Sequence, residues 1–146
     1  MVGDHRSRAR RTFLGVIAFL DSNVVVHHLT QSPPHIGGRA TALLRDATRL
    51  LLTDVVIAEV VFVLERALKV TRPRVADIVQ SLLAMPNVVV VDKGVIGRAL
   101  QIYQRGSIHF VEAYLAATAE STGVGRIASF DRAIDRISTV TRVEVV

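Results

Sequence analysis

Short apolar runs alternate with longer segments of helical periodicity along this chain. Four runs of four or five residues predict buried strands at positions 16–20, 50–53, 88–91 and 126–129. A last segment at 139–145 alternates apolar and polar residues and predicts a fifth strand. Between the strands, apolar residues recur every three or four positions, which predicts helices at 23–29, 39–48, 54–69, 72–85, 94–104, 108–122 and 132–137.

Residues that start and end helices support these boundaries. Thr71 is expected to cap the fourth helix, with Pro73 in its first turn, and Ser107 is expected to cap a later one. Gly123 is placed to end that later helix, and the segment 31–38 is rich in Pro and Gly and predicts a loop. Strands and helices therefore alternate throughout, which favours an α/β fold whose parallel sheet lies between layers of helices.

A chain of 146 residues with 50% hydrophobic and 21% charged residues suits one compact domain. We expect this domain to span residues 13–146, because no linker or internal repeat interrupts the alternation. Cysteine is absent, which excludes disulfides, thiolate zinc sites and a cysteine nucleophile, and is compatible with a cytoplasmic location. No apolar run approaches the length of a membrane span.

Residues 1–12 form a basic N-terminal tail ahead of the domain. The net charge of the chain is +5, and four arginines fall in this tail. A basic protein attracts polyanions, and nucleic acid is the first candidate. The tail could equally be a solubilising extension or follow from a misassigned start codon. A signal peptide is not favoured, because the next apolar run is short, ends at Asp21 and lacks an A-x-A cleavage site.

Four acids carry the candidate chemistry, namely Asp21, Glu59, Glu112 and Asp131. Asp21 and Asp131 follow the first and fourth predicted strands, and ligands of open α/β sheets bind at the carboxyl ends of strands. Glu59 has only apolar residues three and four positions away along its helix, so its side chain is expected to lie on the apolar face of the helix that packs against the core. Glu112 has mainly apolar helical neighbours and is also expected to face inward.

Each acid also has an ordinary structural interpretation. Asp21 and Asp131 can simply cap the helices that follow them. Glu59 can form an ion pair with Arg66, and Glu112 can be an acid near a helix start that the helix dipole favours.

Together the four acids favour a metal site. If the first and fourth strands are neighbours in the sheet, all four side chains converge on one crevice. Four close carboxylates repel each other, and a hard cation such as Mg²⁺ or Mn²⁺ removes that conflict. A site of this kind typically serves phosphate chemistry, in which a metal-activated water attacks phosphorus.

The order of the acidic segments resembles the PIN-domain nucleases, and most of all the VapC toxins of bacterial toxin–antitoxin pairs. These segments are LDSN around Asp21, IAEVVFVL around Glu59, HFVEAYLAA around Glu112 and SFD ending at Asp131. The likeness runs from about Ala18 to the C-terminus, which is nearly the whole chain.

This resemblance implies a three-layer α/β/α sandwich with a central, mostly parallel sheet. It implies cleavage of RNA, at tRNA or single-stranded sites, with Mg²⁺ or Mn²⁺ as cofactor. It assigns the catalytic and metal-binding roles to the four acids, and supporting roles on water or metal to Asn23 and Ser129. It also implies a homodimer that is silenced by a small cognate antitoxin.

Two positions depart from the family pattern. Many relatives carry Asp where this chain has Glu112, and a further Asp where it has His109. The longer Glu side chain could shift the metal geometry, and loss of the second carboxylate could weaken a second metal. His109 could contact phosphate or water, or it could be partly packed in the first helical turn.

Two other functions stay open. A PIN-like domain altered at Glu112 and His109 could bind RNA or a protein partner without cutting. A receiver-type signalling domain also has Asp at a strand end, but this chain lacks the paired acids that such domains use, and Glu59 would be unexplained. For an RNA-binding function, Arg39, Arg45 and Arg126 are candidates for phosphate contacts, together with the tail.

Overall fold

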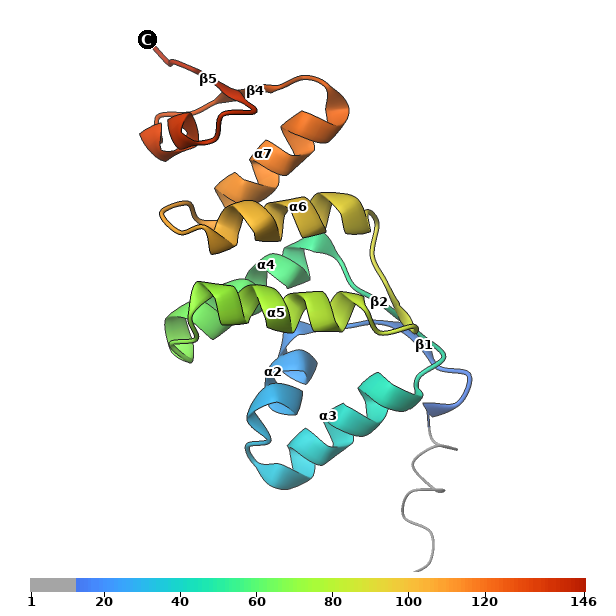
Figure 1. Ribbon diagram of the computed structural model, residues 1–146. Helices are drawn as coiled ribbons and strands as arrows, with labels where there is room; N and C mark the ends of the chain where they lie inside the picture. Colours follow the sequence, from blue (N-terminus) through green and yellow to red (C-terminus); the bar gives the residue numbers. More distant parts are fainter. Residues whose placement is uncertain (1–12) are drawn as a thin grey trace, which may run out of the picture.

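The computed structural model describes residues 13–146, so the predicted basic tail at 1–12 lies outside the described residues. Figure 1 shows the arrangement of the elements. The strands are β1 (Ile17–Phe19), β2 (Arg49–Leu51), β3 (Val88–Val89), β4 (Arg126–Ala128) and β5 (Thr141–Val143). The helices are α2 (Ser22–Thr30), α3 (Pro34–Asp46), α4 (Asp54–Phe62), α5 (Arg72–Leu83), α6 (Lys93–Gln104) and α7 (Phe110–Thr122), with a π-helical turn η1 (Val63–Ala67) and a 3-10 helix η2 (Arg132–Arg136). No helix within residues 13–146 is long and apolar enough to cross a membrane.

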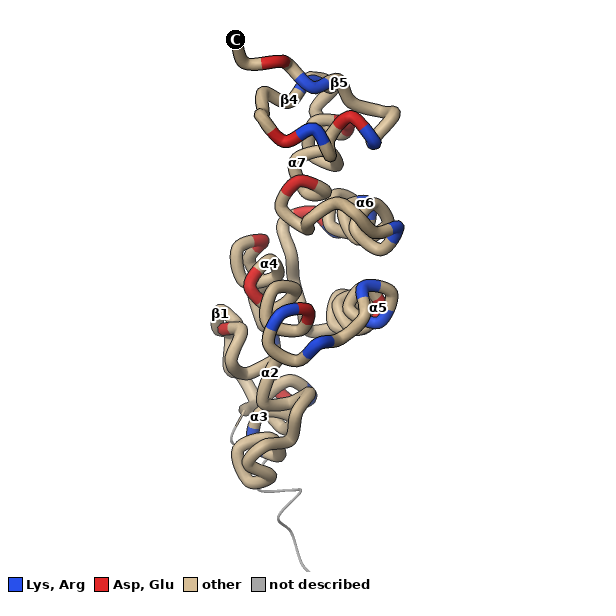
Figure 2. The backbone as a smooth tube through the Cα atoms, turned by 90° about the vertical axis from the view of Figure 1, so that its left-hand side faces the viewer, with Lys and Arg blue, Asp and Glu red and all other residues tan. Residues whose placement is uncertain are grey.

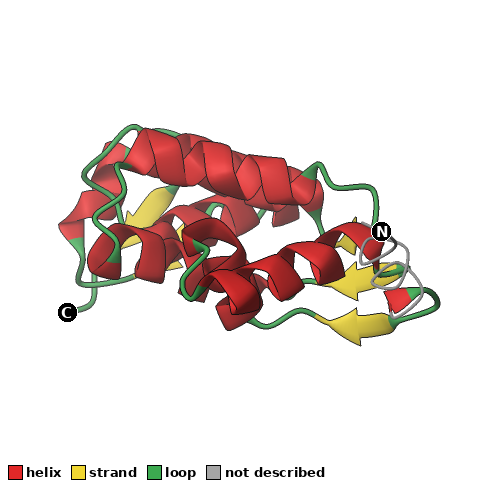
Figure 3. Ribbon diagram, turned by 90° about the horizontal axis from the view of Figure 1, so that it is seen from below, coloured by secondary structure: helices red, strands yellow, loops and turns green. Residues whose placement is uncertain are grey.

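The strands form two parallel sheets. β1, β2 and β3 lie in that order, with Ile17 of β1 opposite Arg49 of β2. β4 and β5 form the second sheet, in which Ala128 lies opposite Val143. The expected α/β fold with parallel strands is confirmed. β1 and β4 are not neighbours, and Figure 3 shows the two groups of strands at opposite ends of the molecule.

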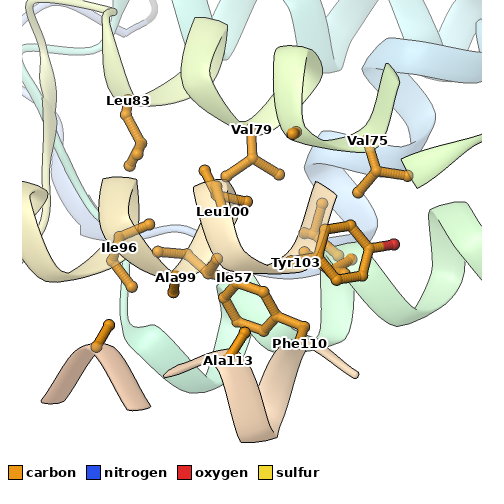
Figure 4. Packing of buried hydrophobic residues seen from close by; sticks show 14 of the residues in the cluster. Ile57, Val75, Val79, Leu83, Ile96, Ala99, Leu100, Tyr103, Phe110 and Ala113 are labelled. Carbon is orange, nitrogen blue, oxygen red and sulfur yellow. The ribbon is translucent and has the colours of Figure 1, made fainter. Parts of the chain in front are cut away.

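α6 lies at the centre of the helical layers, between α5 and α7 (Figure 1). Its contact with α7 is built from small residues, because Ala99, Ala113 and Ala116 are fully buried and let the two helices approach closely. Larger side chains such as Val79 and Leu100 fill the space between α5 and α6 (Figure 4). Burial of one such leucine contributes about 1.5–3 kcal/mol. This stack of α5, α6 and α7 therefore supplies much of the core.

α3 begins earlier than the sequence pattern predicts. Pro34 occupies its first turn, where the missing N–H of proline does no harm, so the expected loop is shorter at its C-terminal end. Gly37 packs against Gln31, and a Cβ at position 37 would lie 2.6 Å from the Gln31 Cα. Gln31 itself ends α2 in the left-handed region, at φ +52°. The Pro and Gly residues that predicted a loop therefore start α3 and allow its close approach to the end of α2.

The long helix predicted at 54–69 changes character at Val63, where α4 passes into η1. A π-helical turn rotates the following side chains relative to a regular helix. The spacing of Glu65 and Lys69 is typical of a surface ion pair on a regular helix, but that pair is not formed among the described residues. Glu65 instead accepts a hydrogen bond from the Tyr103 hydroxyl at 2.5 Å and lies 3.5 Å from Nε of Arg72.

The predicted N-cap at Ser107 is also wrong. Ser107 lies in the left-handed region at φ +70°, and α7 begins only at Phe110, with His109 as its N-cap residue. Gly123 ends α7 as expected, in the left-handed conformation at φ +75°.

An ion pair joins α6 to α7. Arg98 donates from Nε to Glu120 Oε2 at 2.9 Å and from Nη2 to Oε1 at 3.0 Å, and the Thr139 hydroxyl donates to the same carboxylate. The hydrogen bonds from Arg98 lower the pKa of Glu120 below its usual value of 4.5.

This ion pair predicts a pH-dependent stability. The folded-state pKa of Glu120 is depressed, so its contribution is complete above the unfolded value of 4.5 and is lost as the pH falls through the folded value. Arg98→Gln removes the cause of the shift. The variant should therefore lose less unfolding free energy than the wild type between about pH 6 and about pH 3. Urea denaturation across this range measures the difference, and equal pH slopes would contradict the role of the pair.

Candidate functional site

Asp21 follows β1 after one intervening residue and directly precedes α2. Its Oδ1 accepts a hydrogen bond from the Ser22 backbone N–H at 2.7 Å, so the carboxylate caps the helix. The residue is exposed, as is its near neighbour Asn23. A carboxylate offers about four lone-pair sites, and one hydrogen bond leaves the others free for a ligand. Asp21 therefore lies at the end of a strand, as predicted, and it also caps the following helix, as its structural interpretation predicted.

Asp131 occupies the corresponding position after β4. Its Oδ1 accepts a hydrogen bond from the Ala133 N–H at 2.9 Å and so caps η2. Its own backbone N–H donates to Ser129 Oγ, also at 2.9 Å. Ser129 therefore holds the backbone of this acid in place. Asp131 is exposed.

The prediction that Glu59 faces the core is wrong. Glu59 is exposed, and so are its helical neighbours Val55 (78%) and Phe62 (64%), while α4 buries the face that carries Val60. α4 is apolar on nearly every side, so residue spacing could not show which face is covered. The alternative ion pair with Arg66 is not formed within the described residues.

Glu112 lies in the first turn of α7 and is half-buried. Its Oε2 is fully buried and has no hydrogen-bond partner in the described part of the chain. An unsatisfied buried polar atom costs roughly 1–3 kcal/mol, and more when it is charged. The helix dipole offsets part of this cost. Of the four acids, Glu112 is the one whose surroundings favour binding of a cation.

The four acids do not meet in this arrangement. Asp21 and Glu59 belong to the part that carries the first sheet, whereas Glu112 and Asp131 belong to the part built from α7 and β4. Figure 2 shows acidic positions spread along the length of the molecule. Within residues 13–146, no three Asp, Glu or His side chains are close enough together to hold a metal ion. The expected convergence depended on β1 and β4 being neighbours, and they are not.

The chemistry of these residues fits a hard divalent cation, but their arrangement does not. Carboxylate oxygens are the ligands that Mg²⁺ prefers, and the buried Oε2 of Glu112 lacks a partner. A magnesium ion needs its ligand oxygens at about 2.0–2.1 Å, which acids in separate parts of the molecule cannot provide. A complete site therefore requires β4 and α7 to approach β1.

One acid outside the predicted set already joins the two parts. The Tyr114 hydroxyl of α7 donates to Asp54 Oδ2 at 2.5 Å, at the start of α4, while Asp54 Oδ1 is buried without a partner among the described residues. The hydrogen bond to Asp54 raises the pKa of Tyr114, and burial adds to the shift. The sequence pattern marked Asp54 only as a helix start. Its position after the second strand was the signal that could have found it.

His109 is exposed, and its side chain makes no capping hydrogen bond to α7. The His109 side chain is therefore open to solvent at the start of α7. The histidines of α2 have local roles instead. Nδ1 of His27 lies 2.9 Å from the Ser32 carbonyl oxygen, and His28 is similarly bonded to α3.

Large apolar side chains are exposed on β1 and just after β4, which are edge strands of the two sheets. Phe19 and Ile17 on β1 are 73% and 62% exposed, and Phe130, which follows β4, is 79% exposed. Within residues 13–146, β1 and β4 are each hydrogen-bonded to another strand on one side only. An unpaired edge and an apolar patch both favour contact with a further strand or surface.

Comparison with known protein families gives a match that covers most of the chain. Residues 18–140 match the model of the PIN domain, and this range contains all four acids. No curated protein matches the chain. Because the matched region is far more than half of the chain and contains β2, β3, β4 and most of β1, the chain belongs to the PIN domain family.

Proposed function

We propose that this PIN domain is an endoribonuclease that depends on Mg²⁺ or Mn²⁺. PIN domains are generally metal-dependent nucleases, and the family match includes the four acids. The observation that carries the proposal is the position of Asp21 and Asp131. Each follows the carboxyl end of a parallel strand, where α/β folds bind their ligands.

In this proposal the site is completed when β4 pairs with the free edge of β1. Both strands belong to parallel sheets, and each has one side without a partner strand in the described part of the chain. The pairing would cover Phe19 and Phe130, whose exposure is otherwise unfavourable. It would also bring Asp131 beside Asp21.

The four acids would hold the ion in the joined arrangement, and the RNA phosphodiester would be hydrolysed there. Glu112 supports this role through its unpartnered buried oxygen. Ser129 would fix the backbone of Asp131, while Asn23 would support the site beside Asp21. The basic tail, Arg39 and Arg126 would attract RNA, and both arginines are exposed.

We further propose that the nuclease is a cytoplasmic, dimeric toxin with a small antitoxin as its partner. An apolar cavity of about 380 Å³ lies between α2 and α3 and supports a protein contact. Val24, Ile36, Ala40 and Leu43 are among the residues that line it. Grooves of this kind accept the apolar face of a short helix from another protein.

The test of the proposed activity is its dependence on metal. The full-length protein should cut single-stranded RNA or tRNA in Mg²⁺ or Mn²⁺, stop when EDTA is added, and recover when excess Mg²⁺ is restored. The acids need a cation between them because unshielded carboxylates repel each other. Gel analysis of end-labelled RNA measures the rate. Cleavage that continues unchanged in EDTA would contradict the metal dependence.

The second candidate is a PIN-like module that binds RNA or a protein without cutting. The separation of the acids within residues 13–146 favours it. RNA that binds but stays intact in both Mg²⁺ and Mn²⁺, at every ratio of enzyme to RNA, would establish this alternative.

A further inference from the structure

A small cavity lies between the α6–α7 loop and η2. Its volume is about 200 Å³, and its polar lining consists of Arg98, Arg105, Ser107, Arg136 and Ser138, above an apolar floor of isoleucines. Typical ligand pockets measure about 300–1,000 Å³, so this cavity suits one small chemical group. Guanidinium and hydroxyl groups around so small a space select an anion that accepts several hydrogen bonds.

Two of the three arginines carry uncompensated charge. Arg98 is neutralised by its ion pair with Glu120. Arg105 and Arg136 form no ion pair or hydrogen bond through their side chains with any residue of the described range. Asp135, which is next to Arg136 in the chain, is already paired with Arg142 at 3.0 Å. The cavity therefore has a net positive charge that the protein itself does not offset.

The backbone of the loop adds one free hydrogen-bond donor, the N–H of Ser107. Arg105 has right-handed helical angles, and Gly106 follows at φ +84°, in the region that favours glycine. This sequence of conformations turns successive N–H groups toward one side and forms anion-binding concavities in many proteins. Here the N–H groups of Arg105 and Gly106 already donate to the Tyr103 carbonyl oxygen. The N–H of Ser107 has no hydrogen-bond partner among residues 13–146. In this turn, Ser107 therefore keeps a free backbone N–H, and it lines the cavity together with the arginine side chains.

The cavity lies next to two of the candidate catalytic acids along the chain. Its loop leads into the first turn of α7, which carries Glu112, and η2 begins directly after Asp131. A strand of RNA bound at the acids would pass near it with a phosphate other than the one that is cut. We infer that this cavity binds a backbone phosphate of the RNA substrate. The inference rests on the proposed function and adds a substrate-positioning site to it.

Binding of RNA without cleavage tests the inference. In an Asp21→Asn background without divalent metal, fluorescence anisotropy with a labelled single-stranded RNA gives the Kd. Arg105→Gln combined with Arg136→Gln should raise the Kd about tenfold or more and lower the salt slope by about 0.7 for each lost phosphate contact. Both arginines are exposed and unpaired, so thermal stability should not change.

A matched control removes the same charge elsewhere. Arg49→Gln combined with Arg74→Gln changes two exposed arginines outside the cavity and should raise the Kd no more than about twofold. Inorganic phosphate titrated into isotope-labelled protein should shift the amide signals of Ser107 and Ser138, and the Arg105/Arg136 variant should abolish the shifts.

Four outcomes would overturn the inference. The control variant could weaken RNA binding as much as the cavity variant, which would mean that the loss of affinity follows from the lower net positive charge and not from the cavity. Inorganic phosphate could leave the Ser107 and Ser138 signals unmoved. An acidic peptide could compete for the cavity more strongly than RNA, which would assign the cavity to a protein partner.

Failure of the inference can be told apart from failure of the proposed function. If the wild type cuts RNA while the cavity variant binds RNA normally, the inference fails and the proposed function stands. If the cavity variant weakens RNA binding as expected but the wild type does not cut RNA, the inference stands and the proposed function fails.

Discussion

Replacing Asp21 by Asn should lower the rate of RNA cleavage by at least about a hundredfold. Asn keeps the size of the side chain and can still accept the hydrogen bond from the Ser22 N–H that caps α2. It removes the negative charge that a cation requires, so activity should fall while the fold is retained. Asp131→Asn should have the same effect, because its cap on η2 is likewise preserved. Single-turnover rates in Mg²⁺, with circular dichroism to check folding, measure both variants.

Asp77→Asn is the matched control for these two changes. Asp77 is an exposed carboxylate on α5, away from the strand ends, and its variant should cut RNA at the wild-type rate. Wild-type rates for Asp21→Asn and Asp131→Asn as well would end the assignment of the site. A mixture of these two proteins should stay inactive, because both acids are proposed to come from one chain. Recovery of activity in the mixture would instead show that β4 of one copy pairs with β1 of another.

Tyr103→Ala should lower the free energy of unfolding by about 3–5 kcal/mol. The Tyr103 side chain is completely buried in α6, and its hydroxyl donates to Glu65 at 2.5 Å. Its ring meets Phe110 edge-on at a centroid separation of 6.1 Å, and the Arg72 guanidinium lies 4.7 Å from the ring centre. The substitution therefore leaves a cavity at the junction of η1, α5, α6 and the start of α7. Urea denaturation measures the loss.

Tyr103→Phe separates the hydroxyl from the ring. It keeps the packing and the contact with Arg72, so we expect a loss of only about 1 kcal/mol. Burial raises the pKa of Tyr103, and the hydrogen bond to Glu65 raises it further, so the hydroxyl remains a donor throughout the neutral range. An Ala variant no less stable than the Phe variant would mean that the junction relaxes to fill the cavity.

Local pattern predicted the elements of this fold well. Each predicted strand is present, although shortened, and Asp21 and Asp131 lie at strand ends as expected. The signals were strong because apolar runs and strand-end acids are local properties of the chain. The predicted helix boundaries were wrong where the backbone departs from regular helical geometry. This happens at the π-helical turn that begins at Val63 and at Ser107, which has a positive φ.

Burial of the acids could not be predicted in the same way. Glu59 lies among apolar residues on a helix that is apolar all round, and only packing decides which side is covered. Convergence of the acids depends on the pairing of β1 with β4, which joins residues more than a hundred positions apart and leaves no local pattern. The bond between Tyr114 and Asp54 is a long-range contact of the same kind.

The uncovered edge of β1 also bears on solubility. A bare strand edge beside Phe19 is a template on which other chains can add, and such addition leads to aggregates. If β4 closes this edge, the step that builds the catalytic centre also protects the chain from precipitation. Substitutions in β4 that touch neither metal nor RNA would then reduce yield and turnover together.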